Sequence, residues 1–225
     1  MTACFVTGAG TEIGKTYVSC ALLRAWRAKS VACAALKPVV SGFEDTDIAG
    51  SDPALLLNAL GVAPTLERIA GIAPWRYRAP LAPPVAARLE GQTLDFDAVA
   101  DFCEAQMRVT GGALLIEGVG GVMAPLTEGR TNLDLIEALE VPALFVAGTY
   151  LGAISHALTG LTCLDLRGVE IAAVIVSESA ESVGLDETCA LISAQRRGMQ
   201  VIAAPRATGD PAWADALAKR LMPTE

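Results

Sequence analysis

Residues 8–16 read GAGTEIGKT and directly follow the short apolar run ACFVT of residues 3–7. A strand, a glycine loop and a helix in this order are typical of a phosphate-binding loop, in which backbone N–H groups at a helix N-terminus surround a polyphosphate. Lys15 adds a full positive charge, and the Thr16 hydroxyl is suited to a magnesium ion. Five residues separate Gly8 from Gly14, one more than in the common G-x-x-x-x-G-K-[ST] motif, so the loop is extended.

Two other interpretations of this loop fit less well. A glycine-rich turn could simply join a strand to a helix, but Gly-Lys-Thr at the start of a helix argues against that. A dinucleotide-binding turn requires G-x-G-x-x-G and an acidic residue at the end of the second strand. Gly8 and Gly10 fit its beginning, but Ile13 disrupts its third glycine and Lys37 stands at the strand end.

The composition indicates one large α/β domain covering residues 1–225. Hydrophobic residues make up 52% of the chain and aromatic residues 5%, as expected for a parallel sheet with a core of Ala, Val, Leu and Ile. The net charge of -8 would repel a nucleic-acid backbone, so we expect no nucleic-acid partner.

The six cysteines include no C-x-x-C pair, and His156 is the only histidine, so neither a zinc site nor a disulfide framework is expected. Free buried thiols are typical of a reducing compartment. The N-terminus does not resemble a secretory leader, and no apolar run reaches the length of a membrane span. We therefore expect a cytoplasmic protein without a membrane segment.

Strand and helix patterns alternate along the chain. After the first strand, further strands are expected over residues 31–37, 113–117, 142–147, 171–176 and 200–204. Helices are expected over residues 15–28, 53–60, 94–108, 132–139, 153–166, 185–197 and 211–221, and residues 71–91 are expected to form a loop with one short helix. This order predicts a doubly wound, mostly parallel sheet with helices on both faces.

Ligands of such sheets bind at the carboxyl ends of the strands, where two charged residues stand. Lys37 ends the second expected strand and is either an exposed lysine or a second cation at the phosphate site. Glu117 ends the strand over residues 113–117 and precedes Gly118-Val119-Gly120-Gly121. A carboxylate in this place can hold magnesium, and the glycines favour that function over an ordinary turn because they allow close approach to a ligand.

Two further positions have competing interpretations. Ser51 and Asp52 precede Pro53, so they can cap a helix, and Ser51 could do so while Asp52 points toward a metal. Gly152 to His156 begin another helix, whose N-terminus could bind a carboxylate. His156 is expected to be packed or capping, since nothing in the sequence pairs with it.

Several motifs occur together in order over nearly the whole chain. They are GAGTEIGKT (8–16), KPVVSG (37–42), Ser51-Asp52, PLAPPVAARLEG (80–91), IEGVGG (116–121), LGAISH (151–156) and Pro205. This set resembles the dethiobiotin synthetases. The resemblance implies a single P-loop NTPase-type domain and an ATP-dependent ring closure in biotin biosynthesis. One amine of 7,8-diaminononanoate captures CO2 as a carbamate, ATP phosphorylates the carbamate, and the second amine closes the cyclic urea of dethiobiotin.

The resemblance also implies roles for individual residues. Lys15, Lys37 and Thr11 are expected to be catalytic, with the two lysines flanking the transferred phosphoryl group. Thr16, Asp52 and Glu117 are expected to hold Mg²⁺. Thr11, Ser41, Gly152 and Ser155 are expected to contact the substrate, the last two from the partner subunit of a homodimer. The expected ATP-binding residues are Glu12, Ile13, Gly14, Lys15, Thr16, Tyr17, Asp52, Glu117, Gly118, Val119, Gly120, Ser177, Pro205 and Arg206.

The chain departs from the family pattern in places. Where the family usually has an asparagine that recognises adenine, this chain has Ser177, which cannot make the paired contact of an amide. The base selectivity therefore stays open. Ala82-Pro83-Pro84 replaces a frequent Ser-Pro-His, and Ser155 replaces an asparagine, so we expect weaker or rearranged substrate contacts there.

Two other functions share the loop chemistry. A cobyrinate or amidotransferase-type synthetase would normally add a glutaminase domain, for which the chain after Glu117 is too short. A nucleotide switch or partitioning ATPase with a similar loop carries a lysine near the loop start, where this chain has Gly10.

Overall fold

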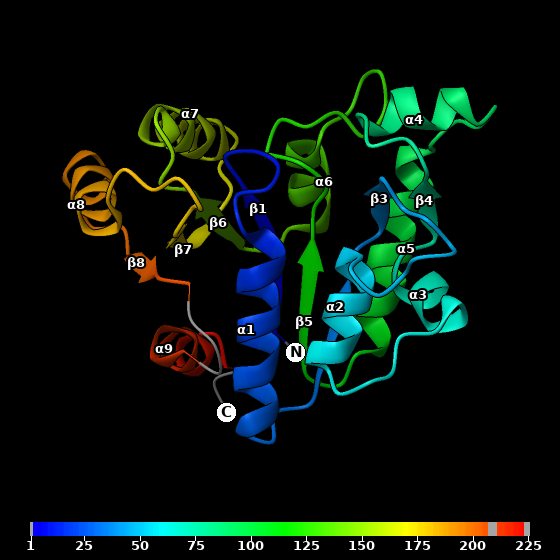
Figure 1. Ribbon diagram of the computed structural model, residues 1–225, viewed down its shortest axis with the longest axis horizontal. Helices are drawn as coiled ribbons and strands as arrows, with labels where there is room; N and C mark the ends of the chain where they lie inside the picture. Colours follow the sequence, from blue (N-terminus) through cyan, green and yellow to red (C-terminus); the bar gives the residue numbers. More distant parts are fainter. Residues whose placement is uncertain (1, 207–210, 223–225) are drawn as a thin grey trace.

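The computed structural model describes residues 2–206 and 211–222 of the chain. Its centre is a six-stranded sheet with the order β2-β5-β1-β6-β7-β8, and every neighbouring pair is parallel (Figure 1). The strands are β1 (Thr2–Gly8), β2 (Cys33–Leu36), β5 (Ala113–Glu117), β6 (Ala143–Ala147), β7 (Ile171–Ser177) and β8 (Val201–Ala204). The predicted doubly wound parallel sheet is confirmed.

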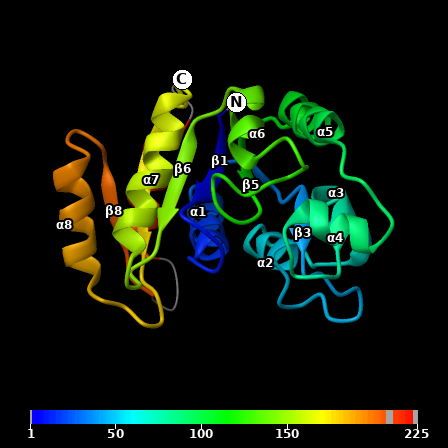
Figure 2. The same ribbon diagram turned by 90° about the horizontal axis from the view of Figure 1, so that it is seen from above.

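Helices cover both faces of this sheet, because its strands are apolar on both sides. Phe5 and Val6 of β1 are fully buried but belong to different cores, one on each face. One core includes residues of α1 (Lys15–Ala28), α2 (Asp52–Ala59) and α9 (Ala212–Arg220). The other includes residues of α5 (Phe96–Val109), α6 (Asn132–Leu139), α7 (Ala153–Leu166) and α8 (Leu185–Gln195). Figure 2 shows α1 and α2 on one side of the sheet and α5 and α6 on the other.

A second, two-stranded sheet stands beside β2. It pairs β3 (Val39–Ser41) with β4 (Trp75–Tyr77) in parallel, and α3 (Leu66–Ile72) and α4 (Pro83–Leu89) accompany it. The helix α4 is the short helix expected within residues 71–91, but the strand β4 was expected to be loop. Three residues are too few for a strand pattern to show in the sequence.

Two local predictions were wrong in detail. The second strand ends at Leu36, so Lys37 lies one residue beyond it, and the Lys37 backbone N–H donates to Ile72 O at 2.9 Å. Ser51 occupies the N-cap position of α2, but its hydroxyl donates to Ile48 O at 2.7 Å and does not cap the helix. Asp52 is the first residue of α2.

The strand register brings the polar strand ends to one edge of the sheet. In β1 and β5 Val6 pairs with Glu117, and in β1 and β6 Gly8 pairs with Val146. Leu36, which precedes Lys37, pairs with Ile116, which precedes Glu117. The phosphate loop, Lys37 and Glu117 therefore meet at the carboxyl edge. None of the helices in residues 2–206 and 211–222 is long and apolar enough to cross a membrane.

Candidate active site

The loop between β1 and α1 closes around its own lysine. Lys15 is almost completely buried, and its Nζ donates to Gly10 O at 2.6 Å. Glu12 and Gly14 both have left-handed backbone conformations, with φ of 58° and 94°. Such conformations turn the N–H groups of a loop inward, which is the geometry of an anion-binding nest.

Both neighbouring side chains and a positive backbone φ exclude any residue with a Cβ atom at position 14. A Cβ atom at this position would lie 2.3 Å from Ser177 Oγ and 2.9 Å from Arg206 Nη2. Ser177 and Arg206, expected at the base end of the nucleotide site, therefore lie directly against the phosphate loop.

A cluster of two carboxylates, a lysine and a hydroxyl lies beside the loop. Lys37 Nζ is 2.6 Å from Glu117 Oε1 and 2.9 Å from Asp52 Oδ2. The Thr16 hydroxyl oxygen lies 2.8 Å from Asp52 Oδ1 and 2.9 Å from Glu117 Oε1. Of the three residues expected to hold a metal, Asp52 and Glu117 thus both contact the hydroxyl of the third, Thr16.

Ser19 completes this cluster and was missed by the sequence analysis. Its buried hydroxyl donates to Glu117 Oε2 at 2.6 Å, which fixes the carboxylate whose other oxygen contacts Thr16 and Lys37. Ser19 stands three residues after Thr16 on α1, so both face Glu117. That helical spacing is the signal that could have identified it.

The charges in the cluster shift one another's proton affinity. Burial and the nearby Lys37 ammonium lower the pKa of Lys15 from 10.5 to about 8, against the opposing effect of Glu117 and Asp52. Burial also acts to lower the pKa of Lys37, but the two carboxylates outweigh it and raise that pKa. Burial acts to raise the pKa of Asp52, but Lys37 and Thr16 outweigh it, so the carboxyl stays ionised at neutral pH.

A cavity of about 1130 Å³ opens in front of the loop and the cluster. Predicted residues that line it are Thr11, Glu12, Gly14, Lys15, Thr16, Tyr17, Lys37, Ser41, Asp52, Val119, Gly120 and Arg206. Its wall also includes Cys20, Arg24, Leu55 and Asn58 on α1 and α2, which the sequence analysis did not single out. Phosphate-binding groups, two lysines and polar side chains share this one cavity.

Three other predicted residues, Ile13, Glu117 and Gly118, do not line the cavity themselves. Glu117 is fully buried and reaches the site through Thr16 and Lys37, and Gly118 O accepts from Lys37 Nζ at 3.2 Å. The Ile13 side chain is buried in the core, where its Cδ1 lies 2.6 Å from the place of a Cβ at Gly8. Any contact of Ile13 with nucleotide would therefore come from its backbone.

Tyr17 contacts two of the other residues that were expected to bind the nucleotide. Its hydroxyl donates to Pro205 O at 2.8 Å, and the Arg206 guanidinium lies over its ring at 4.5 Å. Arg206 Nε donates to Glu178 O at 3.0 Å, which holds the guanidinium in place. Ser177 Oγ is buried, and it has no hydrogen-bond partner within the described part of the chain.

Gly152 and Ser155 stand apart from the cavity wall, at the start of α7. Gly152 is the N-cap in a left-handed conformation, with no side chain to cap the helix. His156 was expected to lack a partner, and this was wrong, because its Nδ1 lies 2.8 Å from Tyr150 Oη. These residues do not join the site within one copy of the chain.

Comparison with known proteins agrees with this geometry. A family model described as an AAA domain matches residues 2–204. The ATP-dependent dethiobiotin synthetase BioD of Caulobacter sp. (strain K31) is 51% identical over 223 residues, which cover 99% of this chain and 95% of the relative. The chain belongs to the dethiobiotin synthetase family. The synthetase of Phenylobacterium zucineum, 47% identical over 98% of this chain and 95% of the relative, supports the same assignment.

A solved structure shows the same fold at much greater sequence distance. The MinC:MinD cell division protein complex of Aquifex aeolicus matches with a TM-score of 0.54 and 12% identity, over 96% of this chain and 86% of that one. This likeness concerns the fold alone. In this dethiobiotin synthetase the phosphate loop and Lys37 line the same cavity.

Proposed function

We propose that the chain converts 7,8-diaminononanoate, CO2 and ATP into dethiobiotin, ADP and phosphate, the activity after which its family is named. The observation that carries the proposal is the pair of buried lysines on one cavity, Lys15 in the phosphate loop and Lys37 beyond β2. A polyphosphate needs cations, and so does a second anion brought against it. A carbamate is such an anion.

The steps balance without a further reactant. An amine of the substrate adds to CO2 and loses a proton, which gives a carbamate. A carbamate oxygen attacks the γ-phosphorus of ATP, and ADP leaves. The second amine then attacks the carbamoyl carbon and loses a proton, the C–O bond breaks, and phosphate departs with an oxygen that came from CO2.

The lysines position the two anions. Lys15 would leave Gly10 O for the β- and γ-phosphates, whose charge compensates for its burial. Lys37 would bridge the γ-phosphate and the carbamate, because it lines the same cavity as the phosphate loop and Ser41 of β3. Both cations neutralise charge where the phosphoryl group is transferred, which is the main electrostatic contribution to this chemistry.

Thr11 and Ser41 are proposed to bind the second substrate. Thr11 is exposed in the extended part of the phosphate loop, and both residues line the cavity. Ser41 Oγ is buried, and among the residues described here nothing hydrogen-bonds to it. A buried hydroxyl without a partner is costly, so a ligand amine or carbamate is the expected partner.

Thr16, Asp52 and Glu117 fit Mg²⁺. One oxygen of each carboxylate lies within 2.9 Å of the Thr16 hydroxyl oxygen. Mg²⁺ prefers such oxygen ligands and completes its coordination with phosphate oxygens and water. In residues 2–206 and 211–222 no group of three or more His, Cys, Asp or Glu side chains could hold a metal ion, so the proposed site relies on two carboxylates and the Thr16 hydroxyl. When bound, the ion would neutralise charge on the β- and γ-phosphates.

The nucleotide base is proposed to lie near Tyr17, Ser177, Pro205 and Arg206. The unpartnered Ser177 Oγ is positioned to make one hydrogen bond, and Arg206 offers a cation over the Tyr17 ring. The loop residues Glu12 to Thr16 would then hold the phosphates, and the segment Gly118 to Gly120 would contact ATP at its γ-phosphate.

The active enzyme is proposed to be a cytoplasmic homodimer. Gly152 and Ser155 can contact a substrate only at the cavity of another subunit, since they lie off the cavity of their own. The uncapped start of α7 would stabilise the substrate carboxylate there. All six cysteines are free, which suits a reducing compartment.

The test is the dependence of ADP formation on both co-substrates. Purified protein with Mg²⁺ and ATP should release ADP only when 7,8-diaminononanoate and bicarbonate are both present, and dethiobiotin should form in equal amount. Appreciable ADP release with ATP alone, unaffected by the diamine, would contradict the proposal and favour a nucleotide switch.

A further inference from the structure

The segment Gly118 to Gly121, here called the glycine loop, forms the wall of the site next to the phosphate loop. Gly118 O accepts a hydrogen bond from Lys37 Nζ, while Val119, Gly120 and Gly121 line the cavity. A Cβ atom at Gly121 would lie 3.2 Å from Gly10, and one at Gly120 would lie 3.7 Å from Thr11 Oγ1. The glycine loop thus packs against the extended part of the phosphate loop.

The backbone fixes the glycine loop at its two ends. Gly118 N–H donates to Val6 O at 3.0 Å, and Val122 N–H donates to Gly8 O at 2.9 Å. Between these points, the side chain of Asn132 holds the loop. Asn132 Nδ2 donates to Val119 O at 2.5 Å and to Gly121 O at 2.8 Å.

The burial of Asn132 at this position is energetically unfavourable for its amide oxygen. It is buried with 1% exposure, and its Oδ1 has no hydrogen-bond partner among the described residues. A buried unpaired amide oxygen destabilises the folded state. The same oxygen lies 3.2 Å from the place of a Cβ at Gly118, so the amide packs directly on the start of the glycine loop.

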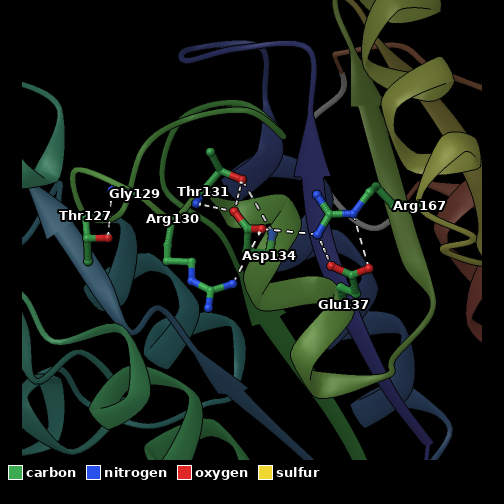
Figure 3. A network of polar contacts seen from close by, with 7 residues as sticks. All are labelled: Thr127, Gly129, Arg130, Thr131, Asp134, Glu137 and Arg167. Carbon is green, nitrogen blue, oxygen red and sulfur yellow. Dashed lines mark hydrogen bonds and ion pairs between the residues drawn. The ribbon is translucent and has the colours of Figure 1, made fainter.

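A network on α6 fixes the position of Asn132, the first residue of that helix. Thr131 and Asp134 form a capping box, with Thr131 N–H donating to Asp134 Oδ2 at 2.7 Å. Figure 3 shows Arg167 reaching Asp134 and Glu137 from the end of α7, and Arg130 beside Asp134. The backbone of α6 is also held without the Thr131 side chain, because Asn132 N–H donates to Ala124 O and Leu133 N–H donates to Val122 O, both at 3.0 Å.

We infer that Asn132 is a positioning residue for the phosphoryl transfer. Its amide holds the carbonyl groups of Val119 and Gly121 and so fixes the backbone that faces Thr11. The same backbone carries Gly118 O, which accepts a hydrogen bond from Lys37. The inference rests on the proposed function. It locates the effect of Asn132 at the γ-phosphate and the second substrate, beside which the glycine loop lies. The proposed contacts of ADP with the phosphate loop, Tyr17 and Arg206 do not involve Asn132.

The test compares Asn132→Ala, Asn132→Ser and Asn132→Asp with the control Thr131→Ala. The control removes the helix cap, and so lowers stability, but keeps the amide that clamps the loop. For Asn132→Ala we expect kcat per folded molecule to fall about tenfold to a hundredfold, since a misplacement near 1 Å can cost that much. The Kd for ADP, measured by calorimetry, should change by less than about twofold on the same reasoning.

The other two variants test how the activity depends on the side chain at position 132. Asn132→Ser keeps one donor and should retain more activity than Asn132→Ala, whereas Asn132→Asp places a carboxylate against two carbonyls and should be the least active. Hydrogen exchange gives a readout that needs no activity. The amides of residues 118–124 should exchange faster in Asn132→Ala than in Thr131→Ala.

Two results would overturn the inference. One is equal kcat per folded molecule in Asn132→Ala and Thr131→Ala with equal exchange in the glycine loop. The other is a loss of ADP affinity as large as the loss of rate, which would place the damage in the phosphate loop. Failure of the proposed function would instead appear in the wild-type protein, as ADP release that does not need the diamine, and would leave the exchange result intact.

Discussion

Replacing Lys37 with methionine should destabilise the protein far more than any ordinary loss of a lysine. The substitution keeps the length of the side chain and removes the charge that lies 2.6 Å from Glu117 and 2.9 Å from Asp52. Glu117 is fully buried and Lys37 is 3% exposed, so water cannot replace the missing cation. Breaking a buried pair in this way costs about 3–5 kcal/mol.

That cost can be measured as a melting temperature. For a chain of this size, each kcal/mol shifts Tm by roughly 2–4 °C, so Lys37→Met should lower Tm by about 6–20 °C. The matched control is Lys29→Met, because Lys29 Nζ lies 2.5 Å from Asp215 Oδ1 in a pair whose side chains are 22% and 50% exposed. An exposed pair contributes about 1 kcal/mol or less, so the control should shift Tm by only a few degrees.

The double variant Lys37→Met with Glu117→Gln separates charge from packing. It removes the unpaired carboxylate and should recover part of the lost stability. Catalysis should be abolished in both Lys37 variants, while ADP binding largely survives on Lys15 and the phosphate loop. Equal Tm shifts for Lys37→Met and Lys29→Met would refute the reasoning, since burial would then make no difference to the two pairs.

Three further outcomes are expected. Gly14→Ala should weaken ATP binding at least tenfold and lower the free energy of unfolding by about 1–3 kcal/mol. The added methyl group would lie 2.3 Å from Ser177 Oγ, and the backbone has a φ of 94°. An unchanged Kd for ATP would contradict this. Asp134→Asn should cost about 1 kcal/mol at pH 7 in urea unfolding. Burial acts to raise the pKa of Asp134, but hydrogen bonds from Thr131 and Arg167 outweigh it and hold that pKa below 3.8, so the difference from wild type should persist above about pH 4 and vanish as the pH falls through the folded pKa. Ser177→Asn should raise the kcat/KM for ATP relative to CTP by about tenfold, because an amide makes the paired contact that a hydroxyl cannot; an unchanged ratio would place the base elsewhere.

The sequence predicts the sheet well because its signals are local. The strand over residues 113–117 and the helices over residues 132–139 and 153–166 have the predicted ends, since continuous apolar runs and helical spacing determine them. The strands β3 and β4 pair across more than thirty residues of chain, and each has only three residues, so no local pattern reveals them. Ser41 reaches the cavity through this pairing.

The candidate site is predictable where chemistry coincides with a strand end. Lys37 and Glu117 satisfy that rule, and the structure places them in direct contact. The strand-end rule does not identify Ser19, which lies inside a helix. It also does not identify Asn132, which contacts the site only through backbone carbonyls. Positions that act through such contacts require the three-dimensional arrangement to be seen.

The measurement that tests the central claim most directly follows oxygen from CO2 into phosphate. In the proposed reaction a carbamate oxygen attacks the γ-phosphorus of ATP in this cavity. A short reaction with ATP, ¹⁸O-labelled bicarbonate and the diamine should therefore release phosphate that carries one oxygen derived from CO2. Phosphate that takes its new oxygen from water instead would show simple ATP hydrolysis and would contradict the account.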